Sequence, residues 1–535
     1  MKKTALISVY NKKGIVDFAR QLNELGWQII ASGGTAKFLV EAGLNVRDVA
    51  SLVGSKTILG HRVVTLSREI HAALLARDIN EDQQELKRLN IPWIDLVCVD
   101  IYPLQAEIDN PDNTVESVIE KTDIGGPTLL RSAAKGRRIV IADSADRQHV
   151  INWLKKGQPN KEQGIAKLVA KAEAIVADYC LCSAQYHSKG DRKGLIGEKV
   201  LVGNYGENPW QSPAALFSVK TDDGLALDRF EVIAGTTPSF NNLCDIDRLV
   251  QTITHIAAGF DINWGKAPKI ALGVKHGNAC GAAIGNNQKE VLEKMIDGDK
   301  RAIFGGLVMI NFELDKKAAE TLINYSMPKG ERRLFDGVIA SGFTKETIDI
   351  LQRKTGKCRL IVNQALSQLN RNNLDSAPRF RYVRGGFLHQ PNYTFVLDLK
   401  DSDLIKIGQA TNKEEDDILL AWAIGSTSNS NTITLVRNGY LIANGTGQQD
   451  RVGGCKLAIQ LRAKDAGHKT AGAVAYSDSF FPFIDGPAVL AEAGIKAILT
   501  SSGSIRDNEV IDFCKKEGIT LYLIPDKKAR GFFGH

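Results

Sequence analysis

The chain has 535 residues, of which 43% are hydrophobic and 24% charged, and its formal net charge is +7. This length argues for more than one hydrophobic core, and the composition is that of a globular protein. The small charge, without clustered Lys and Arg, argues against a nucleic-acid partner, and no apolar run reaches the roughly 18 residues of a spanning helix. Eight scattered cysteines and nine histidines show neither a CxxC pair nor metal-ligand spacing. We therefore expect a cytoplasmic protein with reduced thiols, no membrane partner and no metal.

The first part of the chain alternates strand and helix patterns. In chain order the patterns predict a buried strand at 4–9, an amphipathic helix at 14–26, strands at 27–32, 94–100 and 137–144, and a long helix at 161–185. Such alternation is typical of a parallel sheet with helices on both faces. A Gly-rich polar passage at 189–208 predicts a boundary, which gives domains at 1–199 and 200–535.

The second part is again mixed α/β. Residues around Asn438-Gly439 alternate in polarity on both sides of a strong turn signal and predict a hairpin. A strand followed by a helix is expected at 269–285 and again at 472–494. This recurrence indicates two similar halves.

Two helix openings in the first part have the character of phosphate sites. ASGGTAKFLVEAG (31–43) and TDIGGPTLLRSAAK (122–135) each place glycines where a helix begins, and helix N-termini attract anions. Together they predict a phosphorylated ligand at the carboxyl edge of the sheet. Taken alone, SGGT is equally explained by a capped tight turn, and Asp123 by a helix-capping role.

In the second part, GVKHGNACGAAIG (273–285) sets Lys275 beside His276 at the end of a buried strand. A neighbouring Lys disfavours protonation of the imidazole, and neutral imidazole is the form that works as a base. The following small residues would let the backbone approach a ligand. The alternative is a strand end that has emerged into solvent. The loops 204–214 and 477–488 mix aromatics with prolines, which suits either a binding surface or interdomain packing.

Several motifs together resemble one family. They are ASGGTAKFL, RVVTL, IYPL and TDIGGPTLLRSAAK in the first part, and NYGENPWQ, VKHGNACGAA, FGGLVMIN, NGTGQQDRV and SDSFFPFIDG in the second. The chain resembles the bifunctional purine-biosynthesis enzymes that combine aminoimidazole-carboxamide ribonucleotide (AICAR) transformylase with inosine monophosphate (IMP) cyclohydrolase. The resemblance implies a methylglyoxal-synthase-like domain and then two cytidine-deaminase-like α/β halves without zinc, divided near 370–400.

The same resemblance implies chemistry and partners. A formyl group would pass from 10-formyltetrahydrofolate, a co-substrate, to AICAR, and ring closure with loss of water would give IMP. It also implies a homodimer with transformylase sites at the interface. His276 would take the proton of the attacking amine, Lys275 would stabilise charge, and Asn431 would help polarise the formyl group.

Further positions match the family's site residues. Nucleotide- or folate-site matches in the second part are Tyr205, Gly305, Asp336, Arg451, Phe481 (of the Phe480-Phe481 pair), Ser504 and Ile505. Cyclohydrolase ligand-site matches are Lys12, Ser32, Gly33, Gly34, Thr35, Arg62, Thr65, Ile124, Gly125 and Gly126. Tyr102, Asp123 and Lys135 match the groups that handle protons and the oxyanion.

The chain also departs from the family's pattern. In the cyclohydrolase part the departures are Val64 for a lysine, Ser67-Arg68 for His-Pro, Tyr10-Asn11 for Ser-Asp and Asp100 for Asn. In the transformylase part they are Asn204 for Arg, Trp210 for His, Ala279 for Pro, Asn429 for Lys, Asp450 for Ser and Gly531 for Arg. Losing a cation at a reacting centre costs on the order of 100-fold in rate.

Three interpretations therefore stand side by side. The first is an active bifunctional enzyme with replacement cations, for which Arg68, Lys456 and Arg530 are candidates. The second is a transformylase with an inactive cyclohydrolase site. The third is a non-catalytic nucleotide- or folate-binding paralogue.

Overall fold

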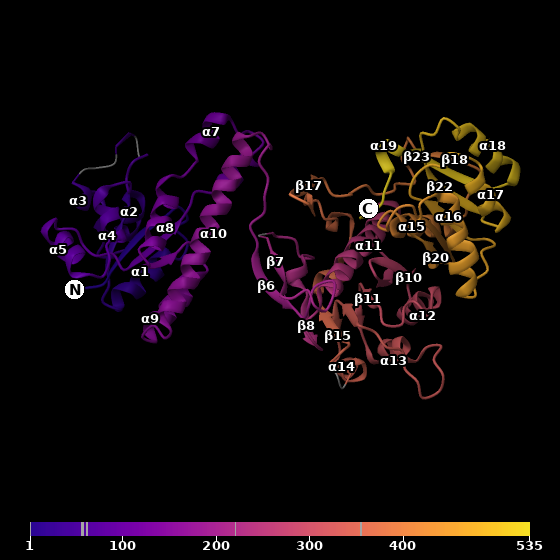
Figure 1. Ribbon diagram of the computed structural model, residues 1–535, viewed down its shortest axis with the longest axis horizontal. Helices are drawn as coiled ribbons and strands as arrows, with labels where there is room; N and C mark the ends of the chain where they lie inside the picture. The colour runs from indigo at the N-terminus through magenta and orange to yellow at the C-terminus, as the bar shows by residue number, and fades with distance from the viewer. Residues whose placement is uncertain (1, 55–57, 60–61, 220, 354–355, 535) are drawn as a thin grey trace. The chain divides into compact units, whose positions relative to one another are not determined.

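A computed structural model describes residues 2–54, 58–59, 62–219, 221–353 and 356–534. The chain divides into a first unit, Met1–Ile196, and a second unit, Gly197–His535 (Figure 1). The sequence predicts a division between residues 199 and 200. The activities expected on its two sides stay predictions at this stage.

The first unit is built on a parallel sheet. Its strand order is β3-β2-β1-β4-β5, with bounds Thr4–Val9 (β1), Gln28–Ala31 (β2), Arg47–Asp48 (β3), Leu96–Asp100 (β4) and Ile139–Ile141 (β5). Every neighbouring pair is parallel. Along β1, Ala5 and Ile7 pack into the core on one face and Leu6 into the core on the other, because successive side chains of a strand alternate. The predicted parallel sheet is confirmed.

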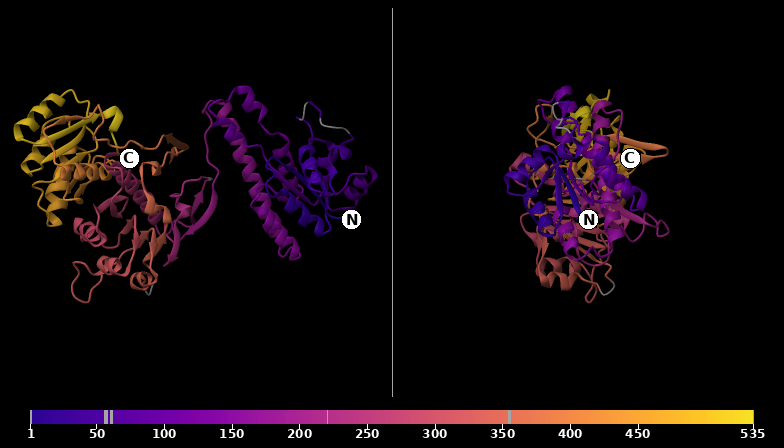
Figure 2. Two further views of the ribbon diagram at one scale, coloured as in Figure 1. Left: turned by 180° about the vertical axis from the view of Figure 1, so that it is seen from behind. Right: turned by 90° about the vertical axis from the view of Figure 1, so that its left-hand side faces the viewer.

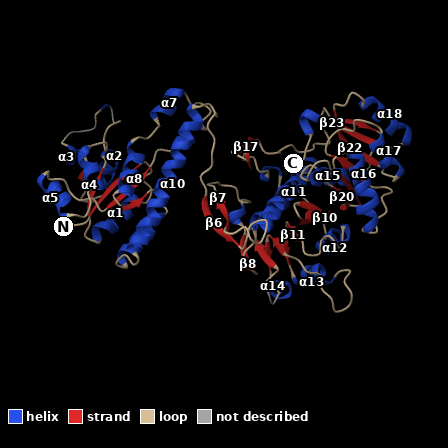
Figure 3. Cartoon of the chain, in the orientation of Figure 1, coloured by secondary structure: helices blue, strands red, loops and turns tan. Residues whose placement is uncertain are grey.

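Helices cover both faces of this sheet (Figure 3). One face is covered by α1 (Ile15–Glu24), α2 (Gly33–Glu41) and α9 (Asp146–Lys155). The other is covered by α4 (Arg68–Leu75), α5 (Asn80–Arg88), α8 (Gly125–Lys135) and α10 (Lys161–His187). The short helices α3 (Ala50–Val53), α6 (Leu104–Ile108) and α7 (Val115–Glu120) lie in connections. The helices expected at 14–26 and 161–185 are thus confirmed as α1 and α10.

The second unit is built on one mixed sheet of 12 strands, made of two halves with the same order. That order is β18-β23-β22-β21-β19-β20-β10-β9-β11-β13-β15-β8. From the centre outward, each half has an antiparallel hairpin, three mutually parallel strands and an antiparallel edge strand. The two similar halves expected from the sequence are therefore present in this sheet.

The strands of the first half are β8 (Glu231–Ala234), β9 (Lys269–Lys275), β10 (Asn278–Gly285), β11 (Leu307–Ile310), β13 (Gly337–Ala340) and β15 (Arg359–Val362). Those of the second half are β18 (Ile405–Ile407), β19 (Ile433–Arg437), β20 (Tyr440–Gly445), β21 (Val474–Ser477), β22 (Ala497–Ser502) and β23 (Thr520–Pro525). Separate pairs are β6–β7 (Glu198–Gly203, Ala214–Ser218), β12–β14 (Glu313–Leu314, Gly342–Phe343) and β16–β17 (Arg379–Val383, Gly386–Gln390).

Helices sandwich the long sheet (Figure 1, Figure 2). Helices α11 (Phe240–Trp264) and α15 (Asn412–Gly425) pack against each other over one face and share its core. The other face of the first half is covered by α12 (Gln288–Gly298), α13 (Lys316–Asn324) and α14 (Lys345–Leu351). That of the second half is covered by α16 (Arg451–Lys456), a π-helix at Leu457–Ala463, α17 (Asp485–Glu492) and α18 (Asp507–Glu517). Of the helices in the described ranges, none is long and apolar enough to cross a membrane.

The structure corrects one expected element. Residues 269–285 form the hairpin β9–β10, not a strand followed by a helix. Its small residues serve helix packing, because a Cβ on Gly281 would lie 2.2 Å from the carbonyl oxygen of Met295 in α12. The strand and helix expected at 472–494 are confirmed as β21 and α17, and the hairpin around Asn438-Gly439 as β19–β20.

Candidate functional site

The first unit gathers hydroxyl groups where β1 and β2 end. Ser32 directly precedes α2, and its Oγ lies 2.8 Å from Ser8 Oγ. The buried Thr35 Oγ1 donates to the carbonyl oxygen of Val9 and accepts from the amide of the same residue, both at 3.2 Å. Gly33 and Gly34 form the first turn of α2, where backbone N–H groups favour an anion. The expected helix opening is therefore present at the carboxyl edge of the sheet.

Asp123 and Tyr102 meet at the second helix opening. Asp123 Oδ1 accepts from the amide of Gly126 at 2.9 Å, and Oδ2 accepts from the amide of Tyr102 at 3.4 Å. The capping role considered for Asp123 is thus real. A Cβ on Gly126 would lie 2.5 Å from Asp123 Oδ2, and one on Gly125 would lie 2.9 Å from Thr65 Oγ1. The glycine pair is what lets both side chains approach the start of α8.

A network of buried charges supports this edge. Asp100 ends β4 and accepts from the amides of Tyr10 and Asn11 and, at 3.4 Å, from Arg147 Nη2. Lys12 Nζ donates to the carbonyl oxygen of Tyr10 at 3.3 Å. Burial raises the pKa of Asp100 and lowers the pKa of Lys12. The ion pair of Asp100 with Arg147 therefore lies against the loop that carries Lys12, because Asp100 also accepts from two amides of that loop.

The side chains at this edge are aromatic and acidic. The rings of Tyr10 and Tyr102 meet edge to face, with centroids 5.2 Å apart. Burial raises the pKa of both Tyr102 and Asp123, and the charge of Asp100 adds to the effect on Asp123. A carboxyl with a raised pKa keeps its proton to a higher pH than an ordinary carboxyl, which suits proton transfer.

Three predicted positions of the first unit lie apart from this edge or open to solvent. Arg62 is exposed and pairs with Glu120 at 2.5 Å. Lys135 is the last residue of α8, roughly 15 Å along the helix axis from Gly125 at 1.5 Å per residue. Ile124 precedes the helix and is 59% exposed. The structure brings neither Arg62 nor Lys135 into contact with Asp123.

In the second unit, Lys275 and His276 lie at the tip of the β9–β10 hairpin. Lys275 pairs with Asn278, so that His276 and Gly277 form a two-residue turn. Their φ angles are 57° and 74°, and two successive positive values identify a type I′ turn. Lys275 Nζ donates to the carbonyl oxygen of Phe304 at 2.9 Å. Lys275, at the end of β9, and His276, in the turn, are therefore adjacent at the tip of one hairpin.

Sheet pairing brings two more predicted positions alongside. Strand β11 pairs with both β9 and β13. Gly305 precedes β11 and Asp336 precedes β13, so both lie at the sheet edge where Lys275 ends β9. A Cβ on Gly305 would lie 4.0 Å from Lys275 Nζ. Gly305 has a φ of 76°, a backbone conformation that favours glycine.

A cavity of about 440 Å³ opens where the two halves of the sheet diverge. Strands β10 and β20 pair only at Ala283 and Tyr440. The cavity is lined by Lys275, His276, Asn278, Ala279, Cys280, Gly298, Asp299, Arg301, Ala302, Leu441, Ile442, Ala443, Asn444, Thr446 and Arg462. Both halves therefore contribute to this junction cavity, which is large enough for a small ligand.

The second half also sends a loop toward the hairpin. Asn278 Oδ1 accepts from the amide of Asn429 at 3.3 Å, and Asn444 Nδ2 donates to the carbonyl oxygen of Ala279 at 3.3 Å. Asn431, two residues beyond, donates from Nδ2 to the carbonyl oxygen of Gln448 at 2.9 Å. The contacts bring the Asn429–Asn431 loop to the strand that follows His276.

Charged groups farther along the second half are paired with one another. Arg451 begins α16, donates from Nε to the carbonyl oxygen of Ser479 at 3.3 Å and lies 3.5 Å from Asp478. Burial lowers the pKa of Arg451 and raises the pKa of Asp478. Arg530, a candidate replacement cation, donates to Ser479 Oγ at 2.9 Å and pairs with Asp526. Arg530 is therefore already engaged within the chain.

Two departures from the family's pattern have local explanations. A Cβ on Gly531 would lie 2.4 Å from Tyr393 Oη and 2.8 Å from Ser426 Cβ, so no larger residue fits at this position. Asp450 accepts from the amide of Gly453 at 2.7 Å and caps α16. Tyr393 thus fills the space where the resemblance implies an arginine.

The remaining predicted positions lie on other elements than the hairpin. Phe481 is 2% exposed and packs in the core, whereas the neighbouring Phe480 is partly exposed, with the Arg530 guanidinium 5.7 Å from its ring. Ser504 and the fully exposed Ile505 lie in the loop between β22 and α18. Tyr205 lies in the loop between β6 and β7. Phe480 is therefore better placed than Phe481 to contact a ligand.

Two residues of α11 were missed by sequence reasoning. Asp245 Oδ1 accepts from the amide of Gly277 at 2.7 Å. Arg248 donates to Asn429 Oδ1 at 3.3 Å. The pair follows the N-cap Ser239 and has the spacing i, i+3, which places both side chains on one helix face. The i, i+3 spacing of Asp245 and Arg248 is the sequence pattern that could have identified them.

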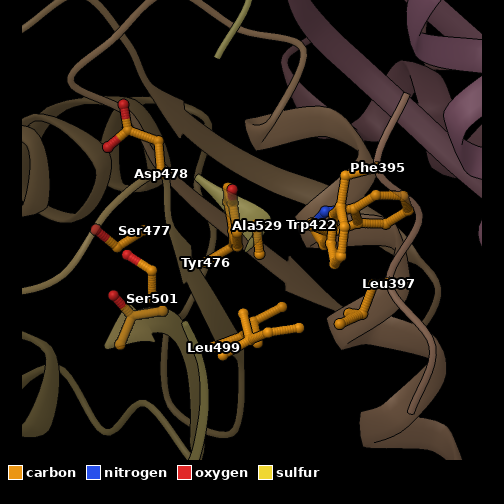
Figure 4. A pocket seen from close by; sticks show the side chains of 11 residues that line it. Phe395, Leu397, Trp422, Tyr476, Ser477, Asp478, Leu499, Ser501 and Ala529 are labelled. Carbon is orange, nitrogen blue, oxygen red and sulfur yellow. The ribbon is translucent and has the colours of Figure 1, made fainter. Parts of the chain in front are cut away.

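A second cavity lies inside the second half, lined by Trp422, Tyr476, Asp478 and their neighbours (Figure 4). Its volume of about 10 Å³ has room for no more than about one water molecule. It is therefore a packing void. Within the described ranges no group of three or more His, Cys, Asp or Glu side chains is placed to hold a metal ion.

Comparisons with known proteins match nearly the whole chain. A family model described as "AICARFT/IMPCHase bienzyme" matches residues 133–461, and one described as "MGS-like domain" matches residues 14–128. The "Bifunctional purine biosynthesis protein PurH" of Anoxybacillus flavithermus (strain DSM 21510 / WK1) is 35% identical over 535 residues, covering 97% of this chain and 98% of that protein. A solved structure described as "Crystal structure of ForH" is 32% identical and covers 36% of this chain and 100% of its own, with a TM-score of 0.32.

Proposed function

The chain belongs to the AICARFT/IMPCHase bienzyme family, and from this premise we propose how its two units divide the reactions. It is a bifunctional enzyme of purine biosynthesis, an AICAR formyltransferase and IMP cyclohydrolase. We assign the cyclohydrolase to residues 1–199 and the transformylase to residues 200–535, with its two halves divided near 370–400. The match of residues 14–128 to an MGS-like domain supports the first assignment.

One observation carries the transformylase assignment. Lys275 and His276 lie together at a rigid turn and line a cavity of about 440 Å³. In the proposed reaction the amine attacks the formyl carbon, His276 takes up the amine proton, and Lys275 stabilises the charge that develops on the formyl oxygen. The bond from the formyl carbon to the donor nitrogen then breaks, and tetrahydrofolate leaves with the proton that His276 returns. The Asn429–Asn431 loop contacts the strand after His276 through Asn429, which supports our proposal that Asn431 of the same loop acts at the formyl group.

For the cyclohydrolase we propose that Asp123 and Tyr102 handle protons at the carboxyl edge of the first sheet. Ser32, Thr35 and the two helix openings would hold the nucleotide there. Val64 is partly buried and supplies no cation. Lys12 lies at this edge, where its Nζ donates to the carbonyl oxygen of Tyr10. We therefore assign to Lys12 the charge stabilisation expected of the missing lysine.

We propose 10-formyltetrahydrofolate as the formyl donor, a homodimer as the active form and the cytoplasm as its location. Exposed apolar side chains on the β16–β17 hairpin support dimerisation, since Tyr382 is 82% and Leu388 59% exposed. An exposed edge strand of this kind is commonly covered in an assembly.

The direct test is a product assay. The purified chain is incubated with AICAR and 10-formyltetrahydrofolate, and the nucleotides are separated at several times beside a control without enzyme. Formation of IMP faster than spontaneous closure is the expected result. Accumulation of the formylated intermediate would mean that cyclohydrolase activity is lost, as expected if no other residue replaces the lysine that the family has where this chain has Val64. Absence of both products would overturn the proposed donor or substrate.

A further inference from the structure

We propose that Asp245 is a positioning residue for formyl transfer, because it holds the hairpin turn that presents His276. The inference rests on the proposed function of the second unit. Asp245 lies on α11, and its Oδ1 accepts from the amide of Gly277, the residue after His276, at 2.7 Å. The bond ties the tip of the hairpin to the longest helix of the unit.

The turn needs such support because of its conformation. His276 has a φ of 57°, a left-handed conformation that is uncommon for residues other than Gly, although Asn, Asp and His adopt it more often than the rest. A histidine held there persists only when surrounding contacts fix it. The bond from Gly277 to Asp245 is a contact of this kind, made within the turn itself.

The second half of the sheet provides an internal reference. Its hairpin turn is Asn438-Gly439, with φ angles of 54° and 77°. Asp417 of α15 accepts from the amides of these residues at 2.8 and 2.6 Å. In each half, therefore, an aspartate from the helix accepts from the amides of a hairpin turn of the same type.

The two aspartates are also equivalent along their helices. Asp245 lies six residues after the N-cap Ser239 (245 − 239), and Asp417 six after the N-cap Thr411 (417 − 411). In the second half the turn carries Asn, the usual residue for this geometry. Only the first half replaces it with His, and only there does the turn line the junction cavity.

Asp245 also belongs to a link between His276 and the second half. One helical turn farther on, Arg248 donates to the carbonyl oxygen of Thr427 and to Asn429 Oδ1. One face of α11 thus contacts both the His276 turn and the loop that leads to Asn431. A shift of this turn would misplace His276 relative to the formyl group, and a misplacement of about 1 Å can cost on the order of 100-fold in rate.

The test compares Asp245→Asn with Asp417→Asn in the full chain. Asparagine keeps one acceptor oxygen but loses the charge, and it adds a donor that faces the turn amides. Asp245→Asn should lower kcat for formyl transfer about 10- to 100-fold with KM for AICAR changed less than about 3-fold. Asp417→Asn should change kcat less than about 2-fold.

A spectroscopic readout separates this inference from the proposed function. The imidazole NMR signals of His276 are assigned by their loss in His276→Asn. They should shift in Asp245→Asn and stay unchanged in Asp417→Asn. If the wild-type chain transfers no formyl group, the proposed function fails and these signals alone decide the inference.

Two results would overturn the inference. One is an equal loss of kcat in both variants, which would mean a general effect on folding. The other is an unshifted His276 signal in Asp245→Asn. Should Asp245→Asn not fold, Asp245→Glu replaces it, because Glu keeps the charge and moves the carboxylate by one methylene. Its His276 signals then decide in the same way.

Discussion

In the first unit the candidate reacting groups lie beyond the ends of parallel strands, whereas in the second unit Lys275 and His276 lie at the tip of an antiparallel hairpin. The strand-end site needs charges to hold its loops, as the contact of Asp100 with Arg147 illustrates. The hairpin site is held mainly by backbone geometry and by one carboxylate, Asp245. The first site should therefore be sensitive to loss of a charge partner and the second to the conformation of its turn.

The largest expected effect is on formyl transfer in His276→Asn. Asn438 shows that asparagine fits this turn, so the substitution removes the imidazole while the hairpin stays intact. We expect kcat for formyl transfer to fall about 1,000-fold, the size of a general-base contribution. The rate is measured by chromatography of the nucleotides.

The control is the cyclohydrolase of the same variant, measured with the formylated intermediate. It should be unchanged, because we assign that activity to the first unit. Unaltered formyl transfer would exclude His276 as the base.

The next effect is on ring closure in Asp123→Asn. Asparagine retains an acceptor for the amide of Gly126, so α8 should still begin correctly, but the proton-transfer group is lost. Cyclohydrolase activity should fall about 100-fold, with formyl transfer unchanged. Thr114→Val is the matched control within the first unit, since Thr114 caps α7 through a bond of 3.0 Å from the amide of Ser117. A loss of ring closure in the control as large as in Asp123→Asn would assign Asp123 a capping role alone.

The two sites also differ in how far the sequence predicts them. Alternating strands and helices with glycines at helix openings predict the first site, because parallel strands bring their carboxyl ends to one edge. Lys135, which the family resemblance groups with Asp123, lies at the other end of α8, and its role stays a prediction. A motif with regular helix geometry spreads its residues along an axis, so closeness in sequence is not closeness in space.

At the second site the sequence predicts Lys275 and His276 as candidates but does not predict the hairpin that carries them. In the second half of the sheet, the Asn438-Gly439 sequence predicts the β19–β20 turn, because Asn and Gly both accept a positive φ. His276-Gly277 lacks this signal, since histidine is unusual in a type I′ turn, and the small residues after it resemble a ligand-binding loop. They are small because α12 packs against them. The support from Asp245 depends on contacts 32 residues away in sequence, which no local pattern contains.

A smaller effect is expected on the stability of the first unit in Arg147→Met. The Asp100 side chain is only 20% exposed and would keep its charge without its guanidinium partner. Breaking such a pair should lower the free energy of unfolding of this unit by about 2–3 kcal/mol, or Tm by about 5–10 °C. Calorimetry measures the shift.

Two further variants identify the cause. Adding Asp100→Asn to Arg147→Met should restore most of the loss, because the unpaired charge is then removed. Arg131→Met breaks the exposed pair with Glu173 and should move Tm by less than about 2 °C. No rescue by Asp100→Asn would mean that packing of Arg147, and not its charge, stabilises the loop.

The smallest effect concerns Asp417, the carboxylate under the second hairpin turn. Burial raises its pKa from 3.8 to about 6, although the amides of Gly439 and Asn438 and the charge of Lys294 act in the opposite direction. Asp416 adds to the rise. The folded chain then binds this proton more tightly than the unfolded chain. The contribution of Asp417 to stability is therefore fully present below about pH 4 and is lost as pH rises through about 6.

The change should be on the order of 2 kcal/mol, and the comparison of wild type with Asp417→Asn isolates it, because other titrating groups cancel in the difference. The measurement is the difference in unfolding free energy between the two proteins from pH 4 to pH 7. It should move in favour of Asp417→Asn as pH rises. A difference that does not vary with pH would mean that the turn amides compensate the buried charge completely. Burial of the Asp417 charge would then cost no free energy of folding. The hairpin turn would in that case need no charged partner, unlike Asp100 in the first unit, which pairs with Arg147.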